Sequence, residues 1–284
     1  MGVHCAVGLP NIGEYGDPEL LVELARAAEA AGWDAAFVWD HVAYREAGWP
    51  LADPYMTVAA IAARTERIRV GVLVSAFARR RPTKLARELA TLDALSGGRL
   101  VVGAGLGSQG EEEYAWFGED PDPRVRAQKL DEGLEIVDGL WRGEPYEFDG
   151  VHLQVRAAPF LPRPVQRPRP PVWIAGRWPA RRPFRRAARW DGVFPTFAGL
   201  ARDATPTTAQ LAEVVAFTRA ERAAAGIDAA APFDVVVEGV SAGPDPALVA
   251  PYADAGLTWW IEKLGWFRGP LDEMRARIAG GPPA

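Results

Sequence analysis

The sequence predicts an α/β protein that folds as a single (β/α)8 TIM barrel. Short apolar runs alternate with longer amphipathic runs, and eight such strand-helix units follow one another along the chain. Several of the short runs are apolar almost throughout, as strands covered on both faces require. The 284 residues, 49% of them hydrophobic, suffice for one large core. An open doubly wound sheet is the alternative architecture.

The helices of the first half carry clear start and stop signals. Asp17 and Pro18 are typical of a helix start, and Gly32 is typical of its end. Asp53 and Pro54 open the next helix in the same way. The predicted strands are residues 4–9, 35–39, 68–75 and 99–107, and the predicted helices are residues 17–32, 53–65, 82–98 and 128–141.

A small β-hairpin is predicted as an insertion after the fourth helix. Residues 145–155 alternate apolar and polar residues around Asp149-Gly150, which is a strong hairpin signal. Residues 156–172 are rich in Pro and Arg without periodicity, and we interpret them as an extended connection within one domain of residues 1–284. The second half predicts strands at 172–176, 191–196, 233–239 and 257–264, and helices at 180–189, 208–226, 246–256 and 270–280.

The composition limits the kinds of binding partner and the cellular compartment that we expect for the protein. A formal charge of −5, from 32 basic and 37 acidic residues, argues against nucleic acid as a partner. One cysteine, Cys5, allows no intrachain disulfide, which fits a reducing cytoplasm. No signal-peptide pattern opens the sequence, and no apolar run approaches the roughly 18 residues of a membrane span. We therefore expect a cytoplasmic protein with no membrane partner.

Asp40 and His41 follow the second predicted strand, where a barrel of this kind places its functional residues. A histidine at this position can donate a hydrogen bond or move a proton near neutral pH. The structural alternative is that Asp40 caps a loop and His41 pairs with a backbone carbonyl.

Two further strand ends carry glycines. The "GAGLGS" stretch after the fourth strand permits close backbone approach to a flat or anionic ligand, although it lacks the G-x-G-x-x-G spacing. The "IAGRW" stretch after the fifth strand leads toward a helix, where backbone N–H groups bind phosphate.

No metal site is expected. The three glutamates at 111–113 have no His or Asp partner at ligand spacing nearby, and acidic residues are favoured at a helix start by its dipole. A metal-dependent barrel hydrolase would need several histidines at strand ends, and only His41 is placed for that role.

An ordered set of short stretches resembles the luciferase-like monooxygenase superfamily. The stretches cover most of residues 20–194, and the last third resembles the family only in its strand-helix pattern. They are "AAGWDAAFVWDH", "RIRVGVLV", "LARELATLDALSGGRLVVGAGLG", "EEEYAWFG", "FDG", "PVQRPRPPVWIAG" and "AARWDGV".

The resemblance implies a barrel that holds a reduced flavin-type ring at the C-terminal strand ends. It places a bulge with a non-proline cis peptide at Leu73-Val74, or one residue on at Val74-Ser75. Asp40 and His41 are implied beside the ring, with His41 as the group that orients or protonates. The implied cofactor contacts are Asp40, His41, Leu73, Val74, Ser75, Ala104, Gly105, and, for the phosphate, Ala175, Gly176, Arg177 and Trp178.

Two cofactors fit the resemblance, namely the 5-deazaflavin coenzyme F420 and FMN. Aspartate-histidine after the second strand resembles the deazaflavin branch, so F420 is preferred. Leu106 stands where sugar-phosphate dehydrogenases of that branch carry a glutamate, which speaks against glucose 6-phosphate as substrate. Arg177 replaces the second glycine of the usual phosphate turn.

The implied activity is hydride transfer between reduced F420 and a small organic substrate. The alternatives are an FMN-dependent monooxygenase that inserts oxygen through a flavin peroxide, and a non-catalytic flavin-binding barrel. An apolar or aromatic substrate is expected from an aromatic supply near the strand ends, and a homodimer is expected through the small apolar helix "MTVAAIAA". The aromatic residues are Tyr44, Trp49, Trp116, Trp259, Trp260 and Trp266.

Overall fold

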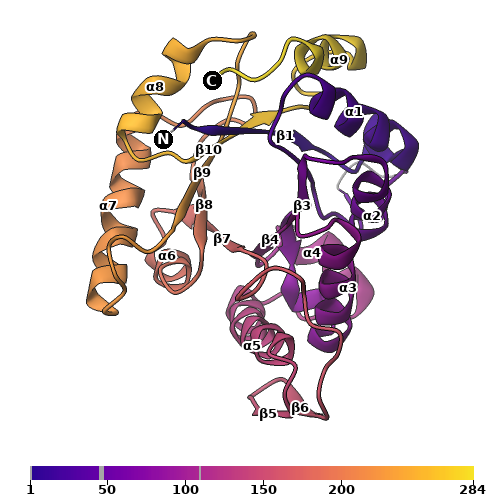
Figure 1. The fold of residues 1–284 in the computed structure, drawn as a ribbon, viewed down its shortest axis with the longest axis vertical. Helices are drawn as coiled ribbons and strands as arrows, with labels where there is room; N and C mark the ends of the chain where they lie inside the picture. The colour runs from indigo at the N-terminus through magenta and orange to yellow at the C-terminus, as the bar shows by residue number, and fades with distance from the viewer. Residues whose placement is uncertain (1, 45–47, 109) are drawn as a thin grey trace.

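Eight parallel strands close into a barrel in the computed structural model, which describes residues 2–44, 48–108 and 110–284 (Figure 1). The strand order around the barrel is β1-β10-β9-β8-β7-β4-β3-β2, which confirms the predicted fold class and excludes the open sheet. The strands are β1 (His4–Leu9), β2 (Ala35–Val38), β3 (Arg69–Ala76), β4 (Leu100–Gly105), β7 (Val172–Trp178), β8 (Gly192–Phe197), β9 (Asp234–Gly239) and β10 (Trp259–Lys263).

Helices surround the barrel and bury their apolar faces against it (Figure 1). Asp17, Asp53 and Asp122 cap three of them by accepting backbone N–H groups of the first turn. The helices are α1 (Pro18–Ala30), α2 (Pro54–Arg64), α3 (Pro82–Leu95), α4 (Gly110–Glu113), α5 (Pro123–Trp141), α6 (Arg181–Ala187), α7 (Thr208–Ala224), α8 (Pro246–Asp254) and α9 (Leu271–Ala279). None of the helices in the described ranges is long and apolar enough to cross a bilayer.

Among the helix ends that differ from the prediction, two have clear local reasons. Helix α5 begins five residues earlier than expected because Asp122 and Pro123 form its cap and first position. Helix α3 ends at Leu95 because Gly97 and Gly98 adopt φ of 64° and 85°, which a helix does not accommodate.

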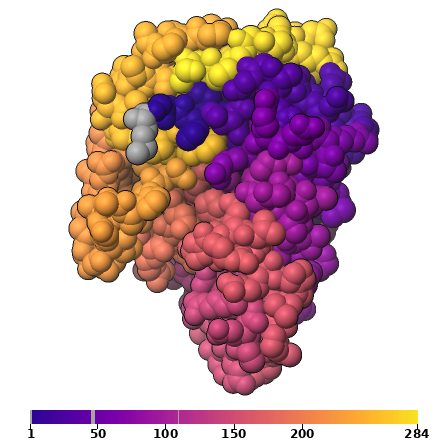
Figure 2. Space-filling model, viewed as in Figure 1, coloured from indigo at the N-terminus to yellow at the C-terminus, as the bar shows by residue number. Residues whose placement is uncertain are grey.

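The predicted hairpin is present as β5 (Tyr146–Asp149) and β6 (Gln154–Ala157) after α5, at the narrow end of the molecule (Figure 2). Its loop, residues 150–153, is longer than an Asp-Gly pair. The Glu132 carboxylate on α5 explains this length, because it accepts the backbone N–H groups of residues 151–153. The connection at 158–171 contains no helix or strand, as predicted.

The end of β3 contains the predicted non-proline cis peptide, between Leu73 and Val74. The ladder with β4 shifts here, because three steps along β3 from Val72 to Ser75 match two steps along β4. This bulge lets two consecutive side chains, Leu73 and Val74, both pack against the cluster inside the barrel.

Large aromatic side chains fill the interior of the barrel. The ring centroids of Phe37, Trp173 and Trp259 lie 5.2 to 6.3 Å apart. Both indole N–H groups donate to the Asp234 carboxylate, at 2.9 Å from Trp173 and 3.2 Å from Trp259. The interior is therefore a packed core, and a cavity opens toward the carboxyl ends of the strands.

Candidate active site at the carboxyl ends of the strands

Asp40 ties the end of β2 to the end of β3. Its carboxylate is 1% exposed and accepts hydrogen bonds from the Ala76 backbone N–H at 2.9 Å, from Arg79 at 2.5 Å and from Arg80 at 2.8 Å. Burial alone raises the pKa of this carboxyl, but the Arg80 and Arg79 guanidiniums outweigh burial and hold the pKa below its usual value. Asp40 is thus a buried anion whose contacts are all internal.

Ser75 lies behind the strand end in the same network. Its side chain is fully buried, and its hydroxyl accepts a hydrogen bond from Tyr55 on α2 at 2.8 Å. The Arg80 guanidinium stacks over the Tyr55 ring with its carbon 4.6 Å from the centroid. Ser75 therefore faces α2, so any contact with a ligand in the barrel mouth falls to its backbone.

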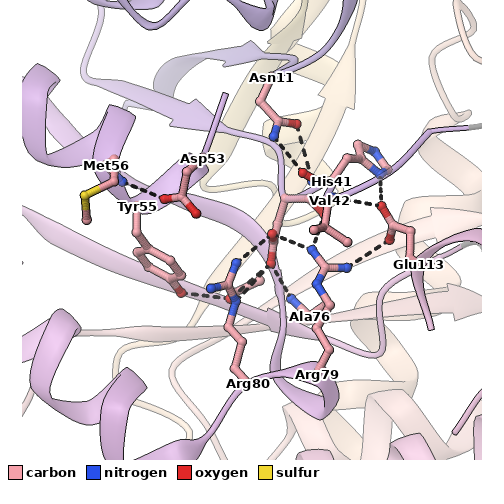
Figure 3. A network of polar contacts seen from close by, with 12 residues as sticks. Asn11, His41, Val42, Asp53, Tyr55, Met56, Ala76, Arg79, Arg80 and Glu113 are labelled. Carbon is pink, nitrogen blue, oxygen red and sulfur yellow. Dashed lines mark hydrogen bonds and ion pairs between the residues drawn. The ribbon is translucent and has the colours of Figure 1, made fainter. Parts of the chain in front are cut away.

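His41 is held by a carboxylate that is distant in the sequence. The Nδ1 atom of His41 lies 2.7 Å from Oε1 of Glu113, and the other Glu113 oxygen accepts from Arg79 at 2.9 Å (Figure 3). Asn11 holds the His41 backbone by pairing with both its N–H and its C=O. A carboxylate accepts only, so Nδ1 carries the proton, and Nε2 has no hydrogen-bond partner among the described residues. The His41 side chain is 14% exposed.

The ends of β3, β4 and β7 form a flat apolar floor in the barrel mouth. Val74 and Ala175 are half-buried and pack against the interior cluster. Gly105 lies between them, because a Cβ added there would be 3.1 Å from Val74 Cγ1 and 3.4 Å from Ala175 Cβ. Ala104 packs instead into the outer core between barrel and helices. Gly105 has no side chain, and its apolar neighbours Val74 and Ala175 form a surface that suits a flat ring system. The residues present therefore fit a flavin-type ring.

The end of β7 separates the predicted phosphate residues. The Arg177 side chain is exposed, whereas Trp178 is buried and donates its indole N–H to Glu213 on α7 at 3.1 Å. Gly176 permits the close approach of α6, since an added Cβ would lie 2.5 Å from Cβ of Pro183. The Arg181 guanidinium stacks over the Trp178 ring. Arg177 and the backbone of 175–177 are thus the groups at this strand end that could hold a phosphate.

The aromatic residues that the sequence grouped together have separate places. Tyr44, Trp49 and Trp266 pack together near the mouth, with the Trp49 and Trp266 centroids 5.1 Å apart. Trp259 belongs to the filled interior and Trp260 to the outer core, while Trp116 is 61% exposed.

A cavity of about 180 Å³ opens at the mouth on the side of β8, β9 and β10. It contains three charged residues that no sequence motif indicated, Arg202, Glu238 and Lys263. Its lining consists of Trp39, Pro195, Thr196, Phe197, Leu200, Ala201, Arg202, Pro206, Glu238, Lys263 and Phe267.

The protein is a TIM barrel with its candidate site at the C-terminal strand ends. The mouth of the barrel contains a bulged third strand, an apolar floor and a histidine-carboxylate pair. The chain belongs to the luciferase-like monooxygenase family, whose model matches residues 1–263.

Named relatives fall into two groups. The chain is 37% identical to an F420-dependent glucose-6-phosphate dehydrogenase of Mycobacterium avium, over 57% of this chain and 49% of that protein. It is 31% identical to the oxygenase component of a flavin-dependent trigonelline monooxygenase of Acinetobacter baylyi, over 58% of this chain and 44% of that protein. The chain thus spans about half the length of these curated relatives. The crystal structure of monooxygenase RslO1 from Streptomyces bottropensis shares the fold, with a TM-score of 0.76 at 22% identity over 98% and 97% of the two chains.

Proposed function

We propose that the protein is an oxidoreductase that binds F420 and exchanges a hydride between this cofactor and a small organic substrate. The observation that carries the proposal is the apolar floor of Val74, Gly105 and Ala175 in the barrel mouth. The relatives named as F420-dependent, at 31 to 37% identity, support the choice of cofactor. Bound F420 supplies the hydride or accepts it.

Each strand end has a distinct task in this proposal. Val74 and Ala175 contact the ring, and Gly105 leaves room for it. The Arg177 guanidinium and the backbone of 175–177 hold the phosphate. His41 presents Nε2 to the charge that hydride transfer leaves on the cofactor ring, while Glu113 keeps the imidazole in one orientation.

Glucose 6-phosphate is not the proposed substrate, although relatives carry that name. The strand-four end offers the half-buried Leu106 where a carboxyl group would be required for proton transfer. A small apolar or aromatic molecule fits the mouth better, because Trp39, Phe197 and Phe267 line its cavity.

An FMN-dependent monooxygenase is the second candidate function. The relative named as a flavin-dependent trigonelline monooxygenase supports it at 31% identity. FMN also has a flat ring and a phosphate, so the floor and Arg177 fit both cofactors.

Titration of the purified protein with F420 and with FMN separates the two candidates. We expect F420 to bind at least about tenfold more tightly, measured by quenching of cofactor fluorescence. Arg177→Ala should weaken binding, whereas Arg156→Ala, on the distant hairpin, should not. Tighter binding of FMN, with oxygen consumed by the reduced complex, would favour the monooxygenase. Binding of neither cofactor would contradict both.

A further inference from the structure

Glu238 and Lys263 point into the barrel from adjacent strands. Val236 and Ile261 belong to the interior cluster, and alternation along a strand places Glu238 and Lys263, two residues further on, on the same inner face. Glu262, which lies between Ile261 and Lys263 on β10, points outward and pairs with Arg268. Glu238 and Lys263 both line the cavity at the mouth.

The strand order places Glu238 opposite the apolar floor. Strand β9 is separated from β3 by three strands in either direction around the barrel, so it stands directly across the mouth from the bulge. Gly8 on β1 is a neighbour of the carboxyl, since an added Cβ would lie 3.8 Å from Glu238 Oε1. A ligand lying on Val74 and Ala175 would therefore present its other face to Glu238.

The Glu238 carboxyl is poised to hold a proton. It has no hydrogen bond or ion pair with any residue in the described ranges, and burial raises its pKa while Lys263 opposes that rise. Burial lowers the pKa of Lys263, whose ammonium donates to the Ala204 carbonyl at 2.7 Å.

The other charged groups near the cavity are Arg202 and Asp203, on the loop after β8. The neighbouring strands β1 and β8 present the uncharged Gly8 and Thr196.

His41 does not line this cavity. The Trp39 ring does, and it packs edge-on against His41 with centroids 6.0 Å apart. A substrate in the cavity therefore has Glu238 as its carboxyl neighbour and is separated from His41 by an aromatic wall.

We propose that Glu238 is the catalytic acid for the substrate, and that the substrate is a small carbonyl compound with an apolar or aromatic substituent. This inference rests on the proposed F420-dependent activity. Reduced F420 would give up a hydride, so that one of its ring C–H bonds would break and the cofactor would be oxidised by two electrons, while the carbonyl carbon would form the new C–H bond. The π electrons of the C=O bond move to its oxygen, and this oxygen takes the Glu238 proton and forms an O–H bond. Glu238 is left as a carboxylate near the Lys263 ammonium, and the reverse steps oxidise the alcohol.

The first test requires no cofactor. We expect the protonated carboxyl band of Glu238 in infrared spectra to persist to a higher pH than that of an ordinary glutamate, whose pKa is about 4.3, and to be missing from Glu238→Gln. Glu144→Gln, which alters an exposed glutamate, should keep the band. Identical spectra for native protein and Glu238→Gln would overturn the assignment.

The second test uses the protein loaded with F420. Glu238→Gln should lower kcat for carbonyl reduction by roughly 10²- to 10⁴-fold, with the Kd for F420 changed less than about threefold and Glu144→Gln unaffected. Native turnover by Glu238→Gln with F420 bound would overturn the role of Glu238 alone. Failure of F420 to bind the native protein would overturn this inference together with the proposed function.

Discussion

Asp40 and His41 are adjacent in the sequence but contribute differently to the site. Asp40 is enclosed by Arg79, Arg80 and the end of β3, whereas His41 keeps one ring nitrogen free of protein partners in the described ranges. Arg79 joins the two, because it bridges the Asp40 and Glu113 carboxylates. A buried network that is satisfied in this way fixes the orientation of the one group left open.

His41→Ala should lower turnover by roughly 10²- to 10⁴-fold, the usual contribution of a positioned acid or base, while the Kd for F420 changes only a few-fold. Glu113→Gln should give a smaller loss, because the amide no longer fixes the protonation of Nδ1. Glu111→Gln is the matched control, since it alters an exposed glutamate on the same short helix. Native turnover by His41→Ala, with any confirmed substrate, would make His41 a structural residue.

Asp40→Asn should lower the free energy of unfolding by about 3–5 kcal/mol at pH 7, as removal of one partner of a buried ion pair does. The pKa of Asp40 is lowered on folding, so the carboxylate stabilises the fold above the unfolded pKa of about 3.9, and this contribution is lost as pH falls further. Urea denaturation should therefore show a difference between native and variant that is large at pH 7 and shrinks below about pH 4.

The exposed helix cap Asp17 provides the control for Asp40, because Asp17→Asn keeps a capping side chain and should change stability little. A pH-independent difference for Asp40→Asn would contradict the ionic role. Asp40→Ala should also weaken cofactor binding, since Ser75 and Ala76 at the end of β3 lose their anchor.

At the scale of elements, the floor depends on how closely β3, β4 and β7 meet. Gly105→Val should weaken F420 binding by at least about tenfold, because its branched side chain would fill the space between Val74 and Ala175. Gly105→Ala should have a smaller effect, since its added carbon would be slightly too close to Val74 and at ordinary contact distance from Ala175. Fluorescence titration measures the affinity, and circular dichroism checks the fold. Unchanged affinity in Gly105→Val would place the ring elsewhere.

The sequence predicted the elements well because their signals are local. Asp-Pro pairs, glycine stops and apolar periodicity act within a few residues, so the strands were located to within a few residues. The bulge at Leu73-Val74 was placed by the resemblance to the family and not by a local signal, and its position is confirmed. The early start of α5 had the same kind of signal, the Asp122-Pro123 pair.

The partners in the site were not predictable by the same means. Glu113 contacts His41 across 72 positions of sequence, and its neighbours Glu111 and Glu112 have the same residue type without that contact. Glu238 is the last residue but one of a strand whose apolar run indicates burial and nothing more. The closed barrel places β9 across from β3, so the proposed role of the Glu238 carboxyl depends on the strand order and not on a local sequence signal.

At the scale of the whole molecule, a surface on α2 supports the predicted homodimer. Met56 is 63% exposed, Ala63 is exposed, and Ala59 and Ala60 are half-buried, so this face is apolar and made largely of small side chains. Small side chains allow two helices to approach closely. Stable interfaces bury about 1,600 Å² in total, which is more than α2 alone can supply, so neighbouring elements would have to contribute to the interface. We propose that two copies of the chain meet across α2.

Light scattering should give a mass about twice the 30.8 kDa of one chain. Met56→Glu should shift the mass toward that of the monomer, because a charge buried in an apolar contact without a partner costs several kcal/mol. Val151→Glu is the matched control, since Val151 is 82% exposed at the tip of the hairpin, far along the chain from α2. A monomeric native mass would refute the dimer. Dissociation by Val151→Glu and not by Met56→Glu would move the interface to the hairpin.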